Sequence, residues 1–396
     1  MPTVVLLGTL DTKGVEYAFL RDRLLEHGVD VLVVDVGVYD PVGLEPDVSR
    51  EEVARNVAEL AAAADRGAAV TAMAAGAEAV VQRLYAEGRL DGILALGGSG
   101  GSSIGSRAMR ALPVGVPKLM VSTVASGDTR PYVGAVDVTM MYSVVDISGV
   151  NSVSARIMAN AAAAIAGMAS ATVPALEAKP LVGATMFGVT TPCVTRARER
   201  LEELGYEVLV FHATGAGGQS LEALVRGGFL VGVLDTTTTE LADELVGGVL
   251  SAGADRLEAA GAAGVPQVVS LGALDMVNFG PRETVPPQFE GRNLYVHNPT
   301  ITLMRTTPDE CGELGRTIGR KLSAATGPTV LFVPLKGVSM IAVEGQPFYD
   351  KDADDALLAG LHETLGPSVE VHELETDIND AAFADAMADR LHELIR

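Results

Sequence analysis

The sequence contains no tryptophan, only two cysteines among 396 residues, and aromatic side chains at 4% of positions. Cys193 and Cys311 are too few and too far apart to form a disulfide framework or a zinc cluster, so a reducing, cytosolic setting is expected. No run of about 18 apolar residues occurs, and the first residues contain no basic segment followed by a cleavage site. The sequence therefore predicts neither a membrane helix nor a secretory signal.

Positive charge is also scarce. Lys and Arg number 29 against 51 Asp and Glu, which gives a formal net charge of −22. Such an acidic chain repels nucleic-acid phosphates and anionic lipid, so neither a nucleic acid nor a membrane is expected as a partner. Apolar residues, at 48%, and 44 glycines are abundant instead. They predict large buried cores and many tight turns.

Short apolar runs alternate with amphipathic segments along the whole chain. The runs are continuous rather than alternating, which is typical of parallel strands covered on both faces. In the first half, strands are expected at residues 3–7, 29–36, 92–96 and 118–122, and helices at residues 15–26, 51–64, 71–87 and 148–171. In the second half, strands are expected at residues 181–185, 206–211, 230–234, 267–271, 329–333 and 368–372, and helices at 195–204 and 221–225.

Two prolines within residues 174–180 indicate a linker between the halves. We therefore predict two open, mostly parallel, Rossmann-like α/β domains, residues 1–173 and 181–396, with a ligand cleft between them. Ligands of such folds bind at the carboxyl ends of the strands. The unusual polar and glycine-rich segments of this sequence fall at those ends.

The first such segment follows the strand at residues 3–7. Thr9, Asp11, Thr12, Lys13 and Gly14 precede the next helix, whose free amides, together with a hydroxyl and a mobile cation, would suit a phosphate. The alternative is a capped helix with Asp11 or Thr12 at the N-cap.

The second segment is richest in glycine. Gly97, Gly98, Ser99, Gly100 and Gly101 follow a strand and leave the backbone unobstructed, so consecutive amides could form a nest for an anion. A flexible turn is one alternative. The segment also matches Gly-x-Ser-x-Gly, which would make Ser99 a nucleophile if a base lay beside it.

The third segment is rich in hydroxyl groups. Ser122, Thr123, Gly127, Asp128 and Thr129 follow another strand and could hold a ribose, a phosphate or hydrated Mg²⁺. A polar loop with local turns would give the same pattern. All three segments are expected at one edge of the same sheet.

The second half supplies four acid–base candidates: His212, Asp235, Asp275 and His297. Each has a structural alternative, because histidines at strand ends are often satisfied by the fold and polar loops are often merely solvated. Asp235 lies before four threonines and Glu240, where Thr237 and Glu240 could form a capping box. A buried Asp275 would require a partner.

Motifs of several enzyme classes are missing. The sequence contains no His-Glu-x-x-His, no Cys-x-x-Cys and no Gly-x-Gly-x-x-Gly dinucleotide fingerprint. These absences weigh against a zinc hydrolase, a thiol oxidoreductase and a Rossmann dehydrogenase.

Taken together, these blocks resemble the family of the ATP-binding domain of the tomato mosaic virus resistance protein, with its uncharacterised bacterial and fungal relatives. The resemblance covers essentially the whole chain and rests on the blocks at residues 8–14, 97–101, 121–128, 140–146, 211–218, 234–240, 272–280, 297–307 and 347–350. It implies two α/β subdomains, with ATP bound by the first. The plant member acts by binding a viral replication protein, an activity that is not expected of this chain.

Three functional hypotheses follow. The first is an ATP-dependent enzyme that acts on a small anionic metabolite with Mg²⁺, using the glycine-rich amides and Lys13 for phosphate and the four candidates for proton transfer. The second is a non-catalytic, ATP-responsive binding protein. The third is an ATP-independent lyase or hydrolase. A homodimer is expected, because two-fold dimers are the commonest oligomers.

Overall fold

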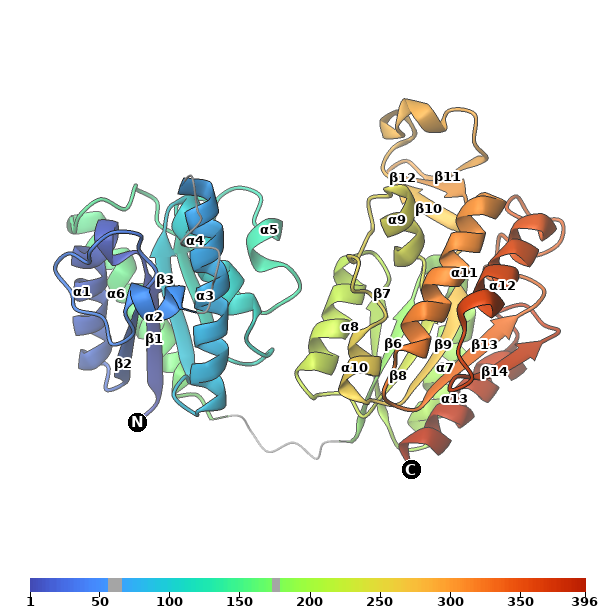
Figure 1. Cartoon of the computed structure of the whole chain (residues 1–396), viewed down its shortest axis with the longest axis horizontal. Coiled ribbons are helices and arrows are strands. Elements are labelled where there is room, and N and C mark those ends of the chain that lie inside the picture. Colours follow the sequence, from blue (N-terminus) through green and yellow to red (C-terminus); the bar gives the residue numbers. More distant parts are fainter. Residues whose placement is uncertain (56–65, 173–178) are drawn as a thin grey trace. The chain divides into compact units, whose positions relative to one another are not determined.

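The computed structural model describes residues 1–55, 66–172 and 179–396, in two compact units, Met1–Ala175 and Leu176–Arg396. Each unit contains its own parallel sheet with helices packed on it (Figure 1). Most of the predicted linker at residues 174–180 lies outside the described residues, as does the second part of the helix expected at residues 51–64.

The first unit contains a five-stranded parallel sheet in the order β2-β1-β3-β4-β5. Its strands are β1 (Thr3–Gly8), β2 (Asp30–Asp35), β3 (Gly92–Gly97), β4 (Lys118–Ser122) and β5 (Thr139–Tyr142). Its helices are α1 (Leu10–Glu26), α2 (Arg50–Ala54), α3 (Arg66–Ala86), α4 (Ser99–Arg110), α5 (Arg130–Val133) and α6 (Ser152–Ala169).

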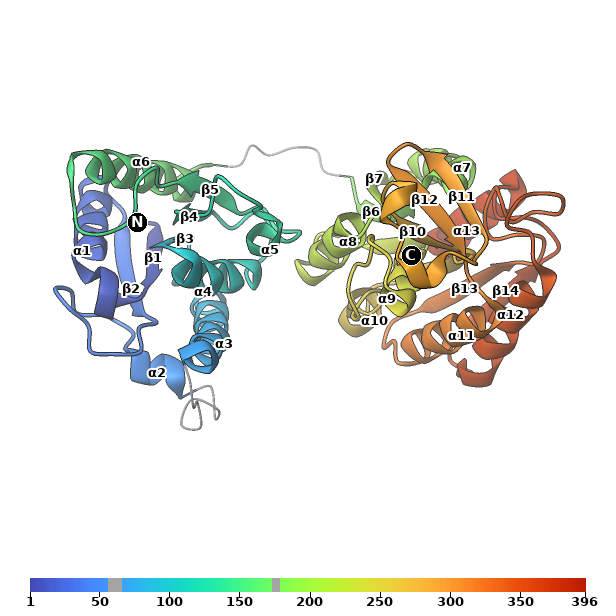
Figure 2. The same ribbon diagram turned by 90° about the horizontal axis from the view of Figure 1, so that it is seen from above.

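Both faces of this sheet are buried, which explains the continuous apolar runs in the sequence. Val4 and Leu6 of β1 pack in a core with α1 and α6, whereas Val5 and Leu7 pack in a second core with α3 and α4. Figure 2 shows these two helix pairs on opposite sides of the strands. Alternate residues of one strand thus enter two different cores.

The second unit contains a six-stranded parallel sheet in the order β14-β13-β9-β8-β6-β7. Its strands are β6 (Leu181–Met186), β7 (Glu207–His212), β8 (Gly232–Thr237), β9 (Gln267–Gly272), β13 (Thr329–Pro334) and β14 (Glu370–Leu374). Its α-helices are α7 (Thr191–Glu203), α8 (Ala216–Arg226), α9 (Glu240–Val246), α10 (Ala259–Ala263), α11 (Pro308–Ser323), α12 (Lys351–Thr364) and α13 (Ala381–Ile395), with short 3-10 turns at Gly188–Thr190, Arg282–Thr284 and Pro287–Phe289.

The two sheets share one topology. In each, the first strand of the unit lies between the second and the third, and later strands add beyond the third in chain order. The predicted fold class, two open parallel α/β layers, is confirmed. The common order also makes the two units topological repeats of one another.

A three-stranded antiparallel sheet was not predicted. It consists of β10 (Met276–Phe279), β11 (Leu294–Asn298) and β12 (Ile301–Arg305), in the order β10-β12-β11, and lies at the top of the second unit in Figure 1. The chain enters it after β9 and leaves it into α11. The segments around residues 272–280, 295–299 and 303–307 form its strands and their connections.

Two boundaries differ from the prediction in ways that matter for the site. The segment at residues 97–101 is not a loop throughout, because α4 begins at Ser99 and Gly98 is its N-cap. The long helix expected from residue 148 begins at Ser152, because the Asn151 side chain accepts the amide hydrogens of Val153 and Ser154 and caps it there.

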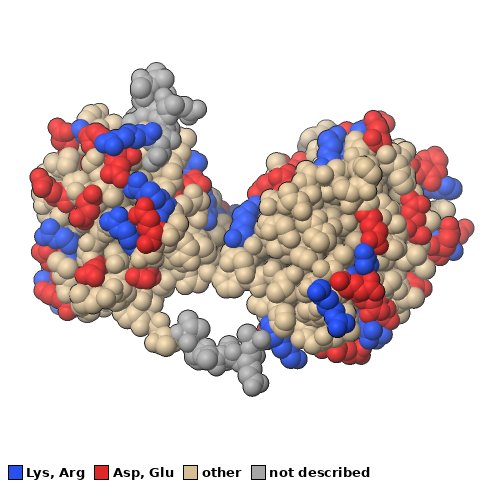
Figure 3. Space-filling view, turned by 60° about the horizontal axis from the view of Figure 1, so that its bottom comes forward, with Lys and Arg blue, Asp and Glu red and all other residues tan. Residues whose placement is uncertain are grey.

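The surface carries charges of both signs, interspersed on the face of the two units that Figure 3 shows. Within residues 1–55, 66–172 and 179–396, no helix is long and apolar enough to cross a membrane.

Candidate functional site

The chain reverses its direction of winding between β1 and β3 of the first unit. The strand that follows β1 lies on one side of it, and β3, β4 and β5 lie on the other. The loops that leave β1 and β3 therefore lead away from each other at the carboxyl ends of these strands, the position at which ligands of open α/β sheets bind. Both glycine-rich segments of the first unit leave the sheet here.

Tyr17 holds the two strands together where they begin to separate. The register between β1 and β3 ends at Leu7 and Ala95. Just beyond it, the Tyr17 hydroxyl accepts the amide hydrogen of Leu96 at 2.8 Å and lies 2.7 Å from the Leu7 carbonyl oxygen, to which it can donate. Its ring occupies the space that a side chain at Gly8 would need. Gly8 is thus required by packing.

The N-terminus of α1 is occupied by carboxylates of the protein itself. Asp35, fully buried at the end of β2, accepts the amide hydrogens of Leu10 at 3.1 Å and Gly37 at 2.8 Å. Asp11 turns away from the helix and accepts those of Val38 and Tyr39. Burial raises the pKa of Asp35. A second anion at this helix end would face these two carboxylates.

The other side chains of this segment that were predicted to bind phosphate also form contacts within the protein. Thr9 and Thr12 share a hydrogen bond of 3.0 Å between their hydroxyls, and the Lys13 ammonium donates to the Ile147 carbonyl oxygen. A side chain at Gly14 would overlap with the carbonyl group of Val42. The structure thus places Thr9, Thr12, Lys13 and Gly14 in contacts within the first unit.

The N-terminus of α4 is different, because no side chain caps it. Gly98 is extended at φ −77° and ψ −161°, and among the described residues no acceptor is bonded to the amides of Ser99, Gly100 or Gly101. The other helices of eight or more residues whose first turns the structure describes all have a side-chain acceptor at that end. These acceptors are Asp35 for α1, Asn151 for α6, Asn379 for α7, Glu240 for α8, Thr307 for α11, Asp350 for α12 and Asp380 for α13.

Two glycines of this segment have no role within the protein. A methyl group at Gly100 would meet no neighbouring atom within 4 Å, and one at Gly98 would meet only Thr123 Oγ1 at 3.7 Å. Neither residue has a positive φ. Gly97 and Gly105, by contrast, are close-packed, since a Cβ there would lie 2.8 Å from Gly101 Cα and Ala95 Cβ, respectively. The bare first turn of α4 is therefore not explained by the fold.

The hydroxyl-rich segment after β4 lies beside the first turn of α4. Ser122 is fully buried and bonds to Ser102 at 2.6 Å, so it joins β4 to α4 and does not face outward. Thr123, half-buried, donates its amide hydrogen to the Gly97 carbonyl oxygen at 3.3 Å. Gly127 is exposed, and Thr129 is the N-cap of α5.

Asp128 does not stand as a free metal ligand. Its carboxylate accepts two hydrogen bonds from the Arg130 guanidinium, at 2.9 and 2.8 Å, and this pairing lowers the pKa of Asp128 to about 2. Across the residues that the structure describes, no group of three or more His, Cys, Asp or Glu side chains could hold a metal ion. Any Mg²⁺ at this edge would therefore have to bind largely through its ligand's phosphates.

The second unit has a glycine-rich helix start that is filled from within. Glu240 Oε1 accepts the amide hydrogens of Gly215 at 2.7 Å and Gly218 at 3.0 Å at the N-terminus of α8. A side chain at Gly218 would overlap with that carboxylate, and one at Gly217 with the His212 backbone. The capping box suggested for Thr237 and Glu240 is wrong, because Thr239 is the N-cap of α9 and Glu240 caps α8 instead.

Arg256, which the sequence analysis missed, lies at the centre of this cluster. It is fully buried and bonds to both oxygens of Asp235 at 2.5 and 2.6 Å and to Glu240 at 2.7 Å, with Glu222 at 3.5 Å. Burial would lower its pKa, but the three carboxylates hold that pKa well above its ordinary value. Asp235 is thus part of a buried ion cluster. No local sequence motif marks Arg256.

Asp275 belongs to a separate buried group. Its Oδ2 accepts a hydrogen bond from the Ser339 hydroxyl at 2.8 Å, and its Oδ1 is buried without a partner among the described residues. Burial raises the pKa of Asp275 to about 6, against the opposing charge of Arg305.

The two histidines are exposed, His212 at the end of β7 and His297 on β11. In the described parts of the chain, no hydrogen bond or ion pair joins any two of the four acid–base candidates.

Comparison with known proteins assigns the chain to a family. Models described as the N-terminal and C-terminal domains of an uncharacterised protein family, UPF0261, match residues 2–174 and 179–395. The chain belongs to this family. A UPF0261 protein of Clostridium tetani is 56% identical over 394 residues, covering 98% of each chain. The tomato protein "ToMV resistance protein Tm-1(GCR237)" is 42% identical over 425 residues, which cover 99% of this chain and 56% of the tomato protein.

The resemblance to the tomato family is therefore confirmed. Solved structures are far more distant. A UDP-N-acetylglucosamine 2-epimerase aligns over 100% of this chain and 97% of its own at 12% identity, with a TM-score of 0.22. No function follows from similarity at that level.

Proposed function

We propose that the first unit of this UPF0261 protein binds a nucleotide through its phosphate groups at the N-terminus of α4. The observation that carries the proposal is the bare first turn: three consecutive amides, at Ser99, Gly100 and Gly101, without an acceptor among the described residues. They lie at the carboxyl edge of a parallel sheet, where its winding reverses. Helix N-termini at that position bind phosphate through free amides and the helix dipole.

The two unneeded glycines support an external occupant. A Cβ at Gly98 or Gly100 would meet little or nothing of the protein, so the fold itself does not require glycine at either position. Bare backbone there allows a phosphate to approach the amides closely, as in other glycine-rich phosphate sites. The structural repeat in the second unit shows the same device with an internal occupant, the Glu240 carboxylate.

ATP is the nucleotide to test first, because this chain resembles the ATP-binding domain of the tomato member of its family. Mg²⁺ would arrive with the phosphates, which neutralises part of their charge in front of an acidic chain of net charge −22. The hydroxyl of Thr123 lies beside Gly98 and could meet the ribose.

The four acid–base candidates all lie in the second unit, and Asp235 is neutralised there by Arg256. The open first turn of α4 therefore supports ATP binding, but it does not by itself support turnover of a small anionic metabolite. A phosphate-release assay with Mg-ATP separates the two: turnover that falls when His212 is replaced by Ala would favour an enzyme, whereas binding without turnover favours an ATP-responsive binding protein.

A thermal-shift screen of nucleotides and small carboxylates with Mg²⁺ tests the proposal. A nucleotide present at about 100 times its Kd should stabilise the protein by about 2.7 kcal/mol. Gly98→Val should remove that stabilisation, and His212→Ala should keep it. If Gly98→Val leaves the nucleotide shift intact, the assignment to α4 is wrong.

A further inference from the structure

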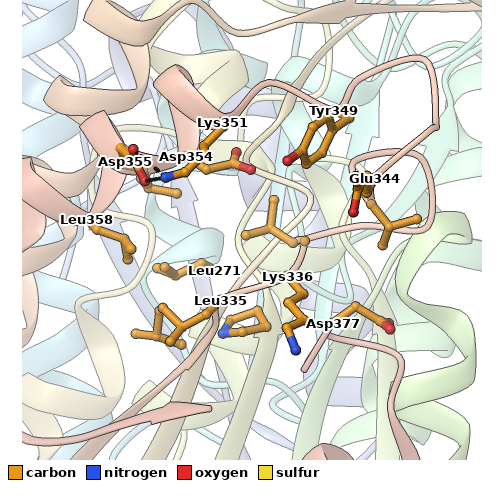
Figure 4. Close-up of a pocket in the computed structure, with 16 residues that line it drawn as sticks. Leu271, Leu335, Lys336, Glu344, Tyr349, Lys351, Asp354, Asp355, Leu358 and Asp377 are labelled. Carbon is orange, nitrogen blue, oxygen red and sulfur yellow. Dashed lines mark hydrogen bonds and ion pairs between the residues drawn. The ribbon is translucent and has the colours of Figure 1, made fainter. Parts of the chain in front are cut away.

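The second unit contains a cavity of about 420 Å³ that the sequence analysis did not single out. It lies at the carboxyl ends of β9 and β13, between the loop that follows β13 and the first turn of α12 (Figure 4). This volume falls within the range of small-molecule sites, and the position is again the ligand-binding edge of a parallel sheet.

The two sides of the cavity differ in chemistry. Leu271, Leu335 and Leu358 form an apolar side in Figure 4, and Glu344 and Asp377 lie across from them. The Tyr349 hydroxyl points into the space from above. A ligand that fits both sides has an apolar body and one polar end.

The charges decide which polar end fits. Two lysines and four carboxylates line the cavity. Lys351 pairs with Asp355 at 2.6 Å, and Asp354 pairs with Arg305 at 2.9 Å.

The remaining lysine has an acidic neighbour outside the cavity. Lys336 lies 3.6 Å from Glu375, which is outside the lining. Glu344 and Asp377 then remain as lining carboxylates without a cationic partner among the described residues.

We infer that this cavity binds a small organic cation: an amine with an apolar alkyl or aryl body. The body would pack on the leucines, and the ammonium would face Glu344 and Asp377, where charge-assisted hydrogen bonds are stronger than neutral ones. The Tyr349 ring at the rim adds a face that attracts cations. An anion of the same shape would instead meet an excess of carboxylates.

Isothermal titration of the full chain with matched probes tests this inference. The probes are 2-phenylethylamine and n-hexylamine as cations, 2-phenylethanol as the neutral analogue and 3-phenylpropionate as the anion. Both amines should bind, and the alcohol and the carboxylate should bind about tenfold more weakly or not at all, as expected for a lost hydrogen bond to a charged group.

Variants locate the binding. The double variant Glu344→Gln with Asp377→Asn should weaken amine binding by about tenfold or more. Glu363→Gln, on α12 but outside the cavity lining, is the control for a lost carboxylate and should change nothing. Leu358→Trp should fill the cavity and abolish binding of both amines, with circular dichroism confirming that the fold persists.

Three results would overturn the inference: no binding of either amine to the wild-type chain, equal or tighter binding of the alcohol or the carboxylate, or amine binding that survives the double variant. Since the cavity lies in the second unit, Gly98→Val should leave amine affinity unchanged. That variant therefore separates this site from the proposed nucleotide site.

Discussion

Arg256 neutralises part of a charge cluster that would otherwise be costly to bury. Three carboxylates surround it, and each is also satisfied elsewhere: Asp235 by the Thr185 hydroxyl, Glu240 by two amides of the α8 turn, and Glu222 by the amides of Leu257 and Ala259. Removing the guanidinium would leave Asp235 and Glu240 buried without a cation, and Glu222 with only the half-exposed Arg226 at 3.8 Å. Breaking a buried ion pair lowers the free energy of unfolding far more than breaking an exposed pair does.

We therefore expect Arg256→Met to lower the free energy of unfolding of the second unit by about 3–5 kcal/mol. Arg282→Met removes a half-exposed partner of Glu290 outside this cluster and serves as the control, with an expected loss of about 1 kcal/mol or less. Urea unfolding followed by circular dichroism compares the two. Equal losses would show that the cluster is not a structural centre.

Asp243 makes stability depend on pH. It is fully buried beside Asn278, and burial raises its pKa from an ordinary value of 3.8 to about 7. Between those two pH values the folded chain holds a proton that the unfolded chain has released. The Asp243 contribution to the free energy of unfolding therefore falls as pH rises through this window, by up to about 1.4 kcal/mol per pH unit.

Asp243→Asn removes this titration. Asn278 Nδ2 donates to Asp243 Oδ2 in the wild type, so a flip of the Asn278 amide lets its Oδ1, which is buried without a partner among the described residues, accept from the new amide. The stability of the variant minus that of the wild type should increase between pH 4 and pH 7 and level off above it. Urea titrations at several pH values measure this difference. Parallel pH profiles would show that Asp243 has an ordinary pKa.

The two glycine-rich helix starts look alike in sequence but have different physical roles. At α4 the first turn is open, whereas at α8 it encloses the Glu240 carboxylate. Gly100→Ala should keep or raise stability, by up to about 1 kcal/mol, because alanine lowers the entropy cost of the helix. Gly218→Ala should destabilise the second unit, since its methyl group overlaps with Glu240.

Thermal unfolding of the two alanine variants checks this contrast. A destabilised Gly100→Ala would mean that the glycine serves the fold, and the argument for an external ligand would lose one of its supports.

The main elements could be predicted from the sequence because their strands are continuous apolar runs covered on both faces. The carboxyl-edge location of the polar segments followed from the same pattern. What could not be predicted depends on partners that are distant in sequence. Glu240 accepts hydrogen bonds from the first turn of α8 although a helix and a strand separate them, and Arg256, in a loop without a recognisable motif, pairs with Asp235. The antiparallel sheet β10-β12-β11 was missed because its strands are only four or five residues long.

Each unit has its own cores. The first unit buries two apolar clusters, one on each face of its sheet, and the second unit buries four more. A domain with its own core can fold alone.

Fragments 1–172 and 179–396 should therefore each unfold cooperatively, with native-like secondary structure at low denaturant. Circular dichroism with urea on the separate fragments measures this. A fragment that is unfolded in buffer would show that the units stabilise each other.

Calorimetric titration of Mg-ATP tests the central claim most directly. The matched pair is Gly100→Val and Gly167→Val: both add the same side chain to a helix of the first unit at a site with no neighbouring atom within 4 Å. Only Gly100 lies in the first turn of α4. The account predicts that the wild type and Gly167→Val bind ATP alike and that Gly100→Val loses binding by about tenfold or more. Unchanged affinity of folded Gly100→Val would contradict it.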